Sequence, residues 1–219
     1  MQISYTKSGI LGGDGVVFYN PLYDGGGTTI GYDMCKHPSI LKHLSNINNT
    51  LEICSGPGFI GFYLLFNGLT KKLWLSDKFD GVLPDILKTN AFNQVDVKFI
   101  HSDCFQNFEK SLKFDLIISN PPHVQHDMEW IRDRKTEEEK HASYRINLDE
   151  DLKFHREFFE NVKNHLNPGG KVILVENQTY ISYATIMDLA GSGFECEVIN
   201  GVYAEKNFYY IVLTLGTRD

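Results

Sequence analysis

The chain has 219 residues, 42% of them hydrophobic and 22% charged, which is typical of a globular protein and too short for two full-sized domains joined by a linker. Its net charge of −7 gives no general attraction for polyanions, so a nucleic-acid partner is less expected than a protein or small molecule, although an acidic protein can carry a local basic patch. No apolar run approaches the roughly 18 residues of a membrane span, and the first residues lack the apolar core of a signal peptide, which predicts a cytoplasmic location and no membrane partner. The four cysteines form no C-x-x-C pair, which predicts reduced thiols.

Residues 1–49 differ in composition from the rest of the chain. The segment 9–29 is rich in glycine and aromatic residues and carries turn signals, which predicts an irregular lid or a short hairpin. A helix is predicted at His37–Leu44, leading into the first strand of the sheet. We therefore expect an irregular N-terminal lid or leader over residues 1–49 and one folded domain over residues 50–219.

From Thr50 onward, short apolar segments alternate with longer amphipathic stretches, which is typical of βαβ units and a parallel sheet. Strands are predicted at 50–54, 72–76, 97–101, 114–119 and 171–176, and helices at 59–67, 82–92, 152–166 and 183–190. The tail from Glu195 to Leu215 predicts two further strands around a turn at 201–207, which is short enough to make them antiparallel neighbours. The expected fold is a Rossmann-like, doubly wound α/β single domain, with a seven-stranded, mostly parallel sheet and an antiparallel C-terminal strand pair.

A second irregular region, Gln125–Glu150, is dense in charge and contains the run RDRKTEEEK. A solvated helix or loop is the more ordinary interpretation of this charge pattern, and a recognition element is the alternative. Residues of this region that could line an acceptor pocket are Trp130, Arg132, Arg134, Tyr144 and Arg145.

The segment LEICSGPGFIG places glycines at positions 56, 58 and 61, between a predicted strand and a predicted helix. Such a turn lets a ligand lie against bare backbone at the helix N-terminus, and it matches the spacing G-x-G-x-x-G. Taken alone the match is weak, because a structural turn in any α/β domain can show it.

Acidic residues stand at the ends of three successive predicted strands. Glu52 precedes Gly56 by four residues, where a carboxylate would repel a pyrophosphate but could pair with the ammonium group of a methionine moiety. Asp77 lies 21 residues after Gly56, where an acid can accept hydrogen bonds from two ribose hydroxyls. Asp103 could accept one from an adenine amino group. Each acid alone could be a solvated residue or a helix cap, but three at successive strand ends favour a nucleoside site. The charge of Glu52 favours S-adenosylmethionine (SAM) over NAD, whereas Asp77 suits both cofactors.

The predicted strand 114–119 runs directly into Asn120-Pro121-Pro122-His123. Two prolines after a buried strand end the hydrogen-bond ladder and stiffen the turn, because proline has no N–H and a fixed φ. In open α/β folds, ligands bind at this carboxyl edge of the sheet. A proline turn is often only structural, but its position after the three acids favours a functional one.

With these residues the chain resembles the class I SAM-dependent methyltransferases, and within them the Asn-Pro-Pro-Tyr amino methyltransferases, which include release-factor and ribosomal-protein glutamine methyltransferases. EICSGPG is similar to the family's acidic glycine motif, LSD to its ribose-binding acid, HSD to its adenine-binding acid, and NPPH to its NPPY turn. The segment LKFHREFFENVKNHLNPGGKVILVEN is similar to the family's helix, turn and fifth strand. The resemblance covers residues 50–215 and implies methyl transfer from SAM to a nitrogen acceptor. It makes residues 50–219 the expected SAM-dependent methyltransferase domain.

Two positions depart from the family pattern. Cys54 stands in place of the first glycine of the motif, and His123 in place of the usual Tyr, Phe or Trp. A small thiol fits at a strand end, whereas histidine keeps a flat ring for stacking and adds a nitrogen that titrates. The histidine leaves the acceptor open between glutamine and other amides or amines.

The resemblance implies that the side-chain oxygen of Asn120 and the carbonyl of Pro121 accept hydrogen bonds from an acceptor NH2, with His123 as a stacking wall or, alternatively, as a proton acceptor. The expected catalytic residues are Asn120, Pro121, Pro122 and His123. The expected cofactor-binding residues are Glu52, Cys54, Gly56, Gly58, Asp77, Lys78, Asp103, Cys104 and Asn120. The histidines have no spacing typical of a metal site, so no metal is expected.

The predicted function is a SAM-dependent N-methyltransferase that acts on an amide or amine nitrogen of a protein side chain or small molecule. A nucleic-acid methyltransferase acting on the exocyclic amine of adenine, cytosine or guanine is the alternative, since the same turn can hold a flipped base. An NAD-dependent oxidoreductase is disfavoured by Glu52 and the proline turn, and a SAM-binding subunit without catalysis by the intact Asn120. The sequence leaves the oligomeric state open.

Overall fold

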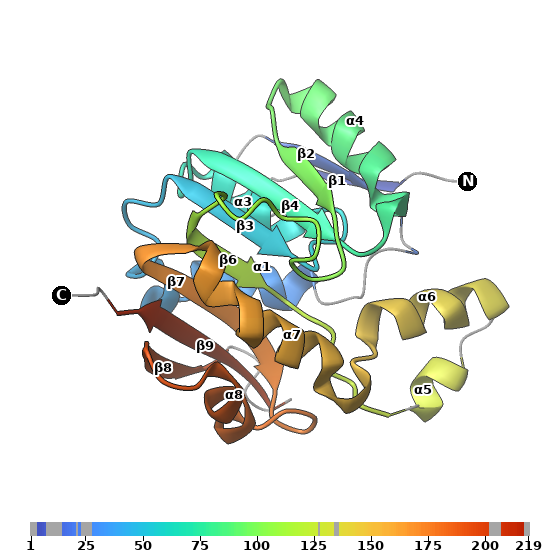
Figure 1. Ribbon diagram of the computed structural model, residues 1–219. Coiled ribbons are helices and arrows are strands. Elements are labelled where there is room, and N and C mark those ends of the chain that lie inside the picture. The colour runs from blue at the N-terminus through green and yellow to red at the C-terminus, as the bar shows by residue number, and fades with distance from the viewer. Residues whose placement is uncertain are drawn as a thin grey trace.

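The computed structural model describes residues 4–7, 15–20, 22, 28–126, 128–133, 136–201 and 207–216. Within them, a seven-stranded sheet has the strand order β5-β4-β3-β6-β7-β9-β8 (Figure 1). Its strands are β3 (Asn49–Ile53), β4 (Lys72–Asp77), β5 (Lys98–His101), β6 (Phe114–Ser119), β7 (Leu166–Asn177), β8 (Phe194–Asn200) and β9 (Phe208–Leu215). Strands β3 to β7 pair in parallel, whereas β9 is antiparallel to both β7 and β8. The predicted α/β fold with an antiparallel C-terminal pair is confirmed.

Side chains of the central strands alternate between two hydrophobic cores, one on each face of the sheet. In β6, Leu116 and Ile118 pack into one core and Ile117 into the other. In β7, Ile173 packs into the first of these cores and Val172 into the second. This alternation buries apolar side chains on both faces, as central parallel strands require.

Helices cover both cores. The first core contains residues of α1 (Thr28–Lys36), α2 (Pro38–Leu41), α3 (Phe59–Phe66) and α4 (Leu83–Asn93). The second contains residues of α7 (Lys153–Asn161), the 3-10 turn Val162–His165 and α8 (Tyr183–Ala190). Two further helices, α5 (Glu129–Arg132) and α6 (Glu137–Asn147), project to one side of the sheet (Figure 1). No helix among the described residues is long and apolar enough to span a membrane.

The N-terminal segment holds more regular structure than the sequence predicts. Helix α1 occupies residues 28–36, which were expected to be irregular, and α2 ends at Leu41 rather than Leu44. Strand β2 (Val16–Tyr19) pairs antiparallel with β1 (Ser4–Lys7). The remainder of the predicted lid, residues 8–14, 21 and 23–27, lies outside the described residues, and the division of the chain at residue 49 stays a prediction.

Polar side chains of α4 bind the backbone of β2 and the residue after it. The N–H groups of Val16 and Phe18 donate to Asn93 Oδ1 at 2.8 Å and Thr89 Oγ1 at 2.9 Å. The N–H of Asn20 donates to Asp85 Oδ2 at 2.7 Å. These bonds attach the N-terminal segment to the domain that follows it.

The predicted helix 152–166 is wrong at its C-terminal end. Helix α7 ends at Asn161, a 3-10 turn follows, and Leu166 already begins β7. Strand β7 pairs Leu166 with Phe114 and then shifts register, so that Lys171 pairs with Leu116. The predicted strand began at residue 171 and so missed residues 166–170 of β7, where the pairing with β6 is irregular.

The charged region 125–150 contains both α5 and α6. Thr136 and Glu139 make a capping box at the start of α6, where each side chain accepts a hydrogen bond from the other residue's backbone N–H. Glu137 and Glu138 in the first turn are exposed. The solvated-helix interpretation is confirmed for this end of α6.

Candidate active site

The glycine turn between β3 and α3 has a left-handed backbone. Gly56 and Gly58 have φ values of 50° and 86°, which glycine adopts without strain. Cys54 also has a positive φ, 55°, although it carries a side chain. A Cβ atom on Gly58 would lie 2.4 Å from Cδ1 of Leu75, so this residue allows the turn to pack closely on β4.

A cavity of about 1060 Å³ opens where the parallel strands end at their carboxyl edge. Small-molecule sites typically have volumes of about 300 to 1,000 Å³, so this space can take a cofactor together with part of an acceptor. The predicted site residues that line it are Glu52, Cys54, Gly56, Asp77, Lys78, Asp103, Cys104, Asn120, Pro121, Pro122 and His123. Gly58 is not among the lining residues, because it packs against Leu75 beneath the turn.

Glu52 joins β3 to α3. Its side chain is buried, and Oε2 accepts a hydrogen bond from the N–H of Gly61 at 2.6 Å. Burial raises the pKa of this carboxyl to about 8, although backbone N–H donors act in the opposite direction. A Cβ atom on Gly61 would lie 2.8 Å from the same oxygen, so the third glycine leaves room for the carboxyl group. The observed partner of Glu52 is therefore the helix, and its pairing with a methionine ammonium stays a prediction.

Asp77, at the end of β4, holds the glycine turn. Its Oδ2 accepts a hydrogen bond from the N–H of Gly56 at 2.8 Å, and its Oδ1 accepts one from the N–H of Phe79 at 2.9 Å. Burial is the main cause that raises the pKa of this carboxyl. The carboxylate lines the cavity with its orientation already fixed by backbone donors, which is the condition for binding a ligand hydroxyl without reorganisation.

An ion pair links the segments that follow β4 and β5. Lys78 Nζ lies 2.6 Å from Asp103 Oδ2, and both side chains are partly exposed at the cavity. Cys104 follows with a φ of 49° and is buried. Burial raises the pKa of both the Cys54 and the Cys104 thiol, so these groups stay protonated.

The Asn-Pro-Pro-His turn follows β6 and faces the same cavity. Ser119, the last residue of β6, donates a hydrogen bond from Oγ to the carbonyl of Ile53 at 2.6 Å. After the turn, Val124 forms an isolated parallel bridge with Leu148. The turn is therefore fastened on one side to β3 and on the other to the segment after α6.

His123 is packed among aromatic rings. Its ring stacks on Tyr180 with centroids 5.7 Å apart and planes at 22°, and it meets Phe208 edge-on at 6.0 Å. Burial is the main cause that lowers the pKa of His123 below its ordinary value. Two aromatic neighbours fit the predicted stacking wall, and a lowered pKa makes the ring a weaker proton acceptor.

Several residues of the cavity were not predicted from the sequence. Tyr180 and Phe208 come from the turn after β7 and from the start of β9, and nothing in their local sequence marks them. Of the residues proposed from the charged region, Tyr144 and Arg145 line the cavity, with the Arg145 guanidinium 5.1 Å from the centre of the Phe79 ring. Arg132 is exposed and does not line it. Arg134 and the side chain of Trp130 lie outside the described residues.

The strand order and the glycine-turn cavity are those of a Rossmann-like methyltransferase fold. A crystal structure of a methyltransferase from Pyrococcus furiosus matches the chain with a TM-score of 0.65 and 17% identity, over 95% of this chain and 92% of that one. The model of the methyltransferase small domain family matches residues 38–133. A putative protein N5-glutamine methyltransferase of Methanocaldococcus jannaschii is 30% identical over 73% of this chain and 78% of that protein. The chain belongs to the family of SAM-dependent methyltransferases that includes this relative.

Two longer relatives show similarity over part of their length. A release factor glutamine methyltransferase of Flavobacterium psychrophilum is 28% identical over 65% of this chain and 51% of that protein. A ribosomal RNA small subunit methyltransferase C of Mannheimia succiniciproducens is 27% identical over 77% of this chain and 41% of that protein. The chain thus spans about half, or less, of the length of these two relatives.

Proposed function

We propose that this chain is a SAM-dependent N-methyltransferase whose acceptor is an amide or amine nitrogen of a protein side chain. The observation that carries the proposal is the shared cavity, because the glycine turn with Asp77 and the Asn120–His123 turn open into the same space. A cofactor site and an acceptor site in contact are what direct group transfer requires. Similarity to proteins named as glutamine methyltransferases supports a protein acceptor.

The residues present fit SAM. The backbone of Gly56 is bare at the mouth of the turn, and the fixed carboxylate of Asp77 lines the cavity beside it. Asp77 would hold the ribose hydroxyls, Asp103 with Lys78 would face the adenine, and Glu52 would lie near the methionine end. When bound, SAM supplies a methyl group on a positively charged sulfur. A nearby positive charge would also lower the pKa of Glu52 from its raised value and favour the carboxylate.

The Asn-Pro-Pro-His turn would orient the acceptor. The side-chain oxygen of Asn120 and the carbonyl oxygen of Pro121 accept hydrogen bonds from the two N–H groups of an amide or amine. Hydrogen-bond acceptors stabilise a nitrogen that becomes more positive during transfer, and the two prolines keep them in place. His123, stacked on Tyr180, forms the flat wall beside them.

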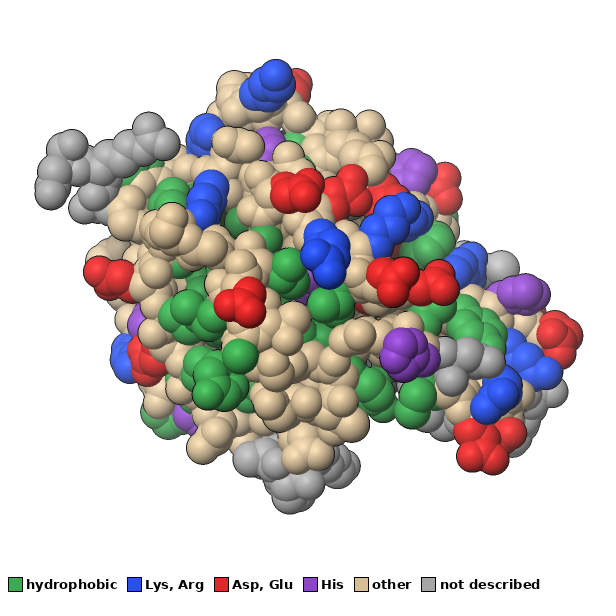
Figure 2. All heavy atoms as spheres, turned by 60° about the horizontal axis from the view of Figure 1, so that its bottom comes forward, with side chains coloured by type: hydrophobic (Ala, Val, Ile, Leu, Met, Phe, Trp, Pro, Cys, Tyr) green, Lys and Arg blue, Asp and Glu red, His purple; other side chains and the backbone are tan. Residues whose placement is uncertain are grey.

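Charge distribution favours a protein acceptor over a nucleic acid. The net charge is −7, and the exposed glutamates of α6 lie on the helix that carries Tyr144 and Arg145 to the cavity. On the face shown in Figure 2, basic side chains lie among acidic ones and form no continuous basic surface. The alternative, the exocyclic amine of a base, is favoured by the similarity to the ribosomal RNA methyltransferase, and the experiment below decides between the two.

The test is transfer of label from methyl-labelled SAM to separated pools of protein, RNA, DNA and metabolites. We expect label in protein, at a nitrogen identified by mass spectrometry, and none with Asn120→Ala. That variant should bind S-adenosylhomocysteine within a few-fold of wild type, and Asn107→Ala, at an exposed position outside the cavity, should transfer label normally. Label in RNA or DNA would support the alternative, and failure to bind S-adenosylhomocysteine would overturn both.

A further inference from the structure

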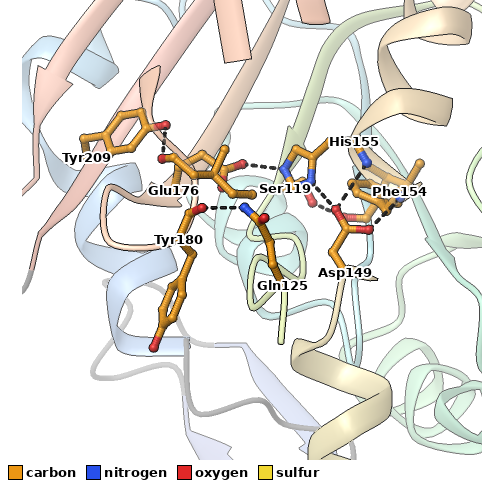
Figure 3. Close-up of polar contacts among 10 residues, drawn as sticks. Ser119, Gln125, Asp149, Phe154, His155, Glu176, Tyr180 and Tyr209 are labelled. Atoms are coloured by element: carbon orange, nitrogen blue, oxygen red, sulfur yellow. Dashed lines mark hydrogen bonds and ion pairs between the residues drawn. The ribbon is translucent and has the colours of Figure 1, made fainter. Parts of the chain in front are cut away.

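Three buried ionisable side chains form a continuous hydrogen-bonded row beside the cavity. His155 lies between two carboxylates: its Nδ1 is 2.6 Å from Asp149 Oδ2, and its Nε2 is 3.0 Å from Glu176 Oε1 (Figure 3). The side chains of His155 and Glu176 are fully buried, and that of Asp149 is 2% exposed. None of the three was predicted as a site residue.

With both carboxyl groups ionised, each ring nitrogen of His155 carries a proton. An ionised carboxylate only accepts hydrogen bonds, so a histidine held between two of them must donate from both Nδ1 and Nε2 and is an imidazolium. Its positive charge offsets part of the charge of two carboxylates that burial would otherwise make costly. Breaking this row from one side would leave an uncompensated charge in the interior.

Asp149 connects the row to the acceptor side of the cavity. Its backbone N–H donates to the carbonyl of Val124 at 2.9 Å, and the N–H of Val124 donates to the carbonyl of Asn147 at 2.9 Å. Val124 directly follows the Asn-Pro-Pro-His turn. The segment 147–149 is therefore paired in a short ladder with the residue that ends the turn.

Asp149 also holds a strained turn that borders the cavity. Its Oδ1 accepts a hydrogen bond from the N–H of Phe154 at 2.6 Å, at the start of α7. Between them, Asp151 and Leu152 have φ values of 54° and 56°, which side chains disfavour. Such a turn persists only where neighbouring contacts over-determine it, and the Asp149 carboxylate makes two of them, with the N–H groups of Phe154 and His155.

Glu176 fixes the other end of the row. It lies near the end of β7, which pairs with β6, the strand that leads into the Asn-Pro-Pro-His turn. The next residue, Asn177, lines the cavity, as does Tyr180, which stacks on His123. His155 thus links two segments that reach the proposed acceptor site from opposite sides.

We propose that His155 is a positioning residue, held as an imidazolium between Asp149 and Glu176. It fastens segment 147–149, together with Val124, to the end of β7. In this way it fixes the wall of the acceptor site. That this wall belongs to an acceptor site rests on the proposed function. The fastening itself is a property of the chain that can be measured without an acceptor.

The row should loosen when His155 loses its proton. Both carboxylates raise the pKa of His155 to about 9, against the lowering effect of burial. The ionisable groups that face the row from neighbouring elements are the ring of His123 and, beside the carboxylates, Tyr209, Cys54 and Cys104. Burial lowers the pKa of His123 and raises the pKa of the other three, so none of them is expected to change charge between pH 7 and 9.

The experiment is amide hydrogen exchange of the whole chain, with protection factors followed at Val124, Asp149 and, as an internal reference, Val212 of β9. Loss of a charge-assisted hydrogen bond should lower protection at Val124 and Asp149 by about tenfold or more in His155→Phe, with Val212 unchanged. Glu176→Gln serves if the Phe variant does not fold. The matched control is His165→Phe, a buried histidine that stacks on Phe105 and whose Nδ1 lies 3.0 Å from the carbonyl oxygen of Leu112.

A pH series separates positioning from simple packing. In the wild type, protection at Val124 and Asp149 should fall as the pH rises through about 9, and this dependence should vanish in His155→Phe. An equal loss of protection at Val212 would overturn the inference. So would protection factors at Val124 and Asp149 that change neither in the two variants nor with pH. Binding of S-adenosylhomocysteine is measured in parallel, because its absence would count against the proposed function and leave the exchange result to be judged by itself.

Discussion

The carboxylate of Asp77 lines the cavity while its two oxygens accept hydrogen bonds from Gly56 and Phe79. We expect Asp77→Ala to weaken binding of S-adenosylhomocysteine by about tenfold or more, because the ribose hydroxyls and the glycine turn both lose their partner. The free energy of unfolding should fall by roughly 2 to 4 kcal/mol, since two backbone donors lose a charged acceptor. Calorimetry and urea unfolding measure the two effects.

Asp80→Ala is the control for that variant, because Asp80 is exposed and lies three residues further along. It should change neither quantity by more than about 0.5 kcal/mol. A loss of stability in Asp77→Ala with unchanged binding would restrict Asp77 to a structural role.

His123 gives a second prediction at this scale. Burial lowers its pKa, so the ring is neutral at pH 7 and gains a proton only below its ordinary titration range. We expect His123→Tyr to keep methyl-transfer activity within a few-fold, and the wild-type rate to show no inflection from His123 between pH 6.5 and 8.5. Rates of both proteins over pH 5.5 to 8.5 test this, with His126→Tyr, at an exposed position nearby, as control. An inactive Tyr variant, with a wild-type rate that falls below about pH 6.5, would make His123 the proton acceptor instead.

Site residues were predictable where chemistry and strand ends coincide. Glu52, Asp77 and Asn120 each stand at or directly after the end of a strand, so a parallel sheet places them at one edge. Their backbone partners were not predictable, and Glu52 proved to bind Gly61. The row Asp149–His155–Glu176 left no sequence signal, because its partners are 6 and 21 residues apart and belong to no spacing rule.

At the scale of elements, the junction of β3 and α3 depends on a glycine inside a helix. A Cβ atom on Gly61 would lie 2.7 Å from Leu73 Cδ1 and 2.8 Å from Glu52 Oε2. Alanine favours helix formation by about 1 kcal/mol, but overpacking here should cost more, so Gly61→Ala should lower the free energy of unfolding by roughly 1 to 3 kcal/mol.

Urea unfolding of Gly61→Ala beside Gly216→Ala measures the effect. Among the described residues, a Cβ atom on Gly216 would meet only Gly193 O, at 3.7 Å, so that variant should unfold like the wild type. A Gly61→Ala protein as stable as wild type would show that α3 can move away from β4 without loss.

Strands were located closely because apolar runs between turn signals define them, and β6 was predicted at its observed bounds. Helix α1 was missed because its sequence begins with two threonines and contains Gly31, which are weak helix formers. Its helical state depends on packing, since a Cβ atom on Gly31 would lie 2.7 Å from side-chain atoms of Ile60 in α3. A contact between distant segments, which no local pattern shows, decides this element.

At the scale of the whole molecule, stability should fall on the alkaline side of neutrality. The folded-state pKa of His155 is raised to about 9 and that of Glu52 to about 8, both above their unfolded values. A group whose pKa is raised by folding stabilises the fold, and its contribution is fully present below the unfolded-state pKa. The contribution is lost as the pH rises through the folded-state pKa. We therefore expect Tm to decrease from pH 7 to about pH 9, where both losses are complete, and to level off above it.

Thermal unfolding over this range tests the prediction in wild type, Glu52→Gln and His155→Phe. Each variant should show a shallower decrease than wild type, because one of the two titrations is removed. Added salt screens exposed charges much more than buried ones, so the difference between wild type and variants should survive 0.5 M NaCl. Identical slopes in all three proteins would assign the decrease to general charge repulsion.

The hydroxyl of Ser119 continues the pairing of β3 and β6 one step beyond their last backbone pair, Glu52 with Ile118, by donating to the carbonyl of Ile53. Beyond this bond the two strands diverge, one into the glycine turn and the other into the Asn-Pro-Pro-His turn. A single buried hydroxyl thus ties the two strands together at the point where the two turns begin. Displacements of about 1 Å can change transfer rates by a hundredfold, so reaction speed in this molecule is open to adjustment through a side chain that touches neither reactant.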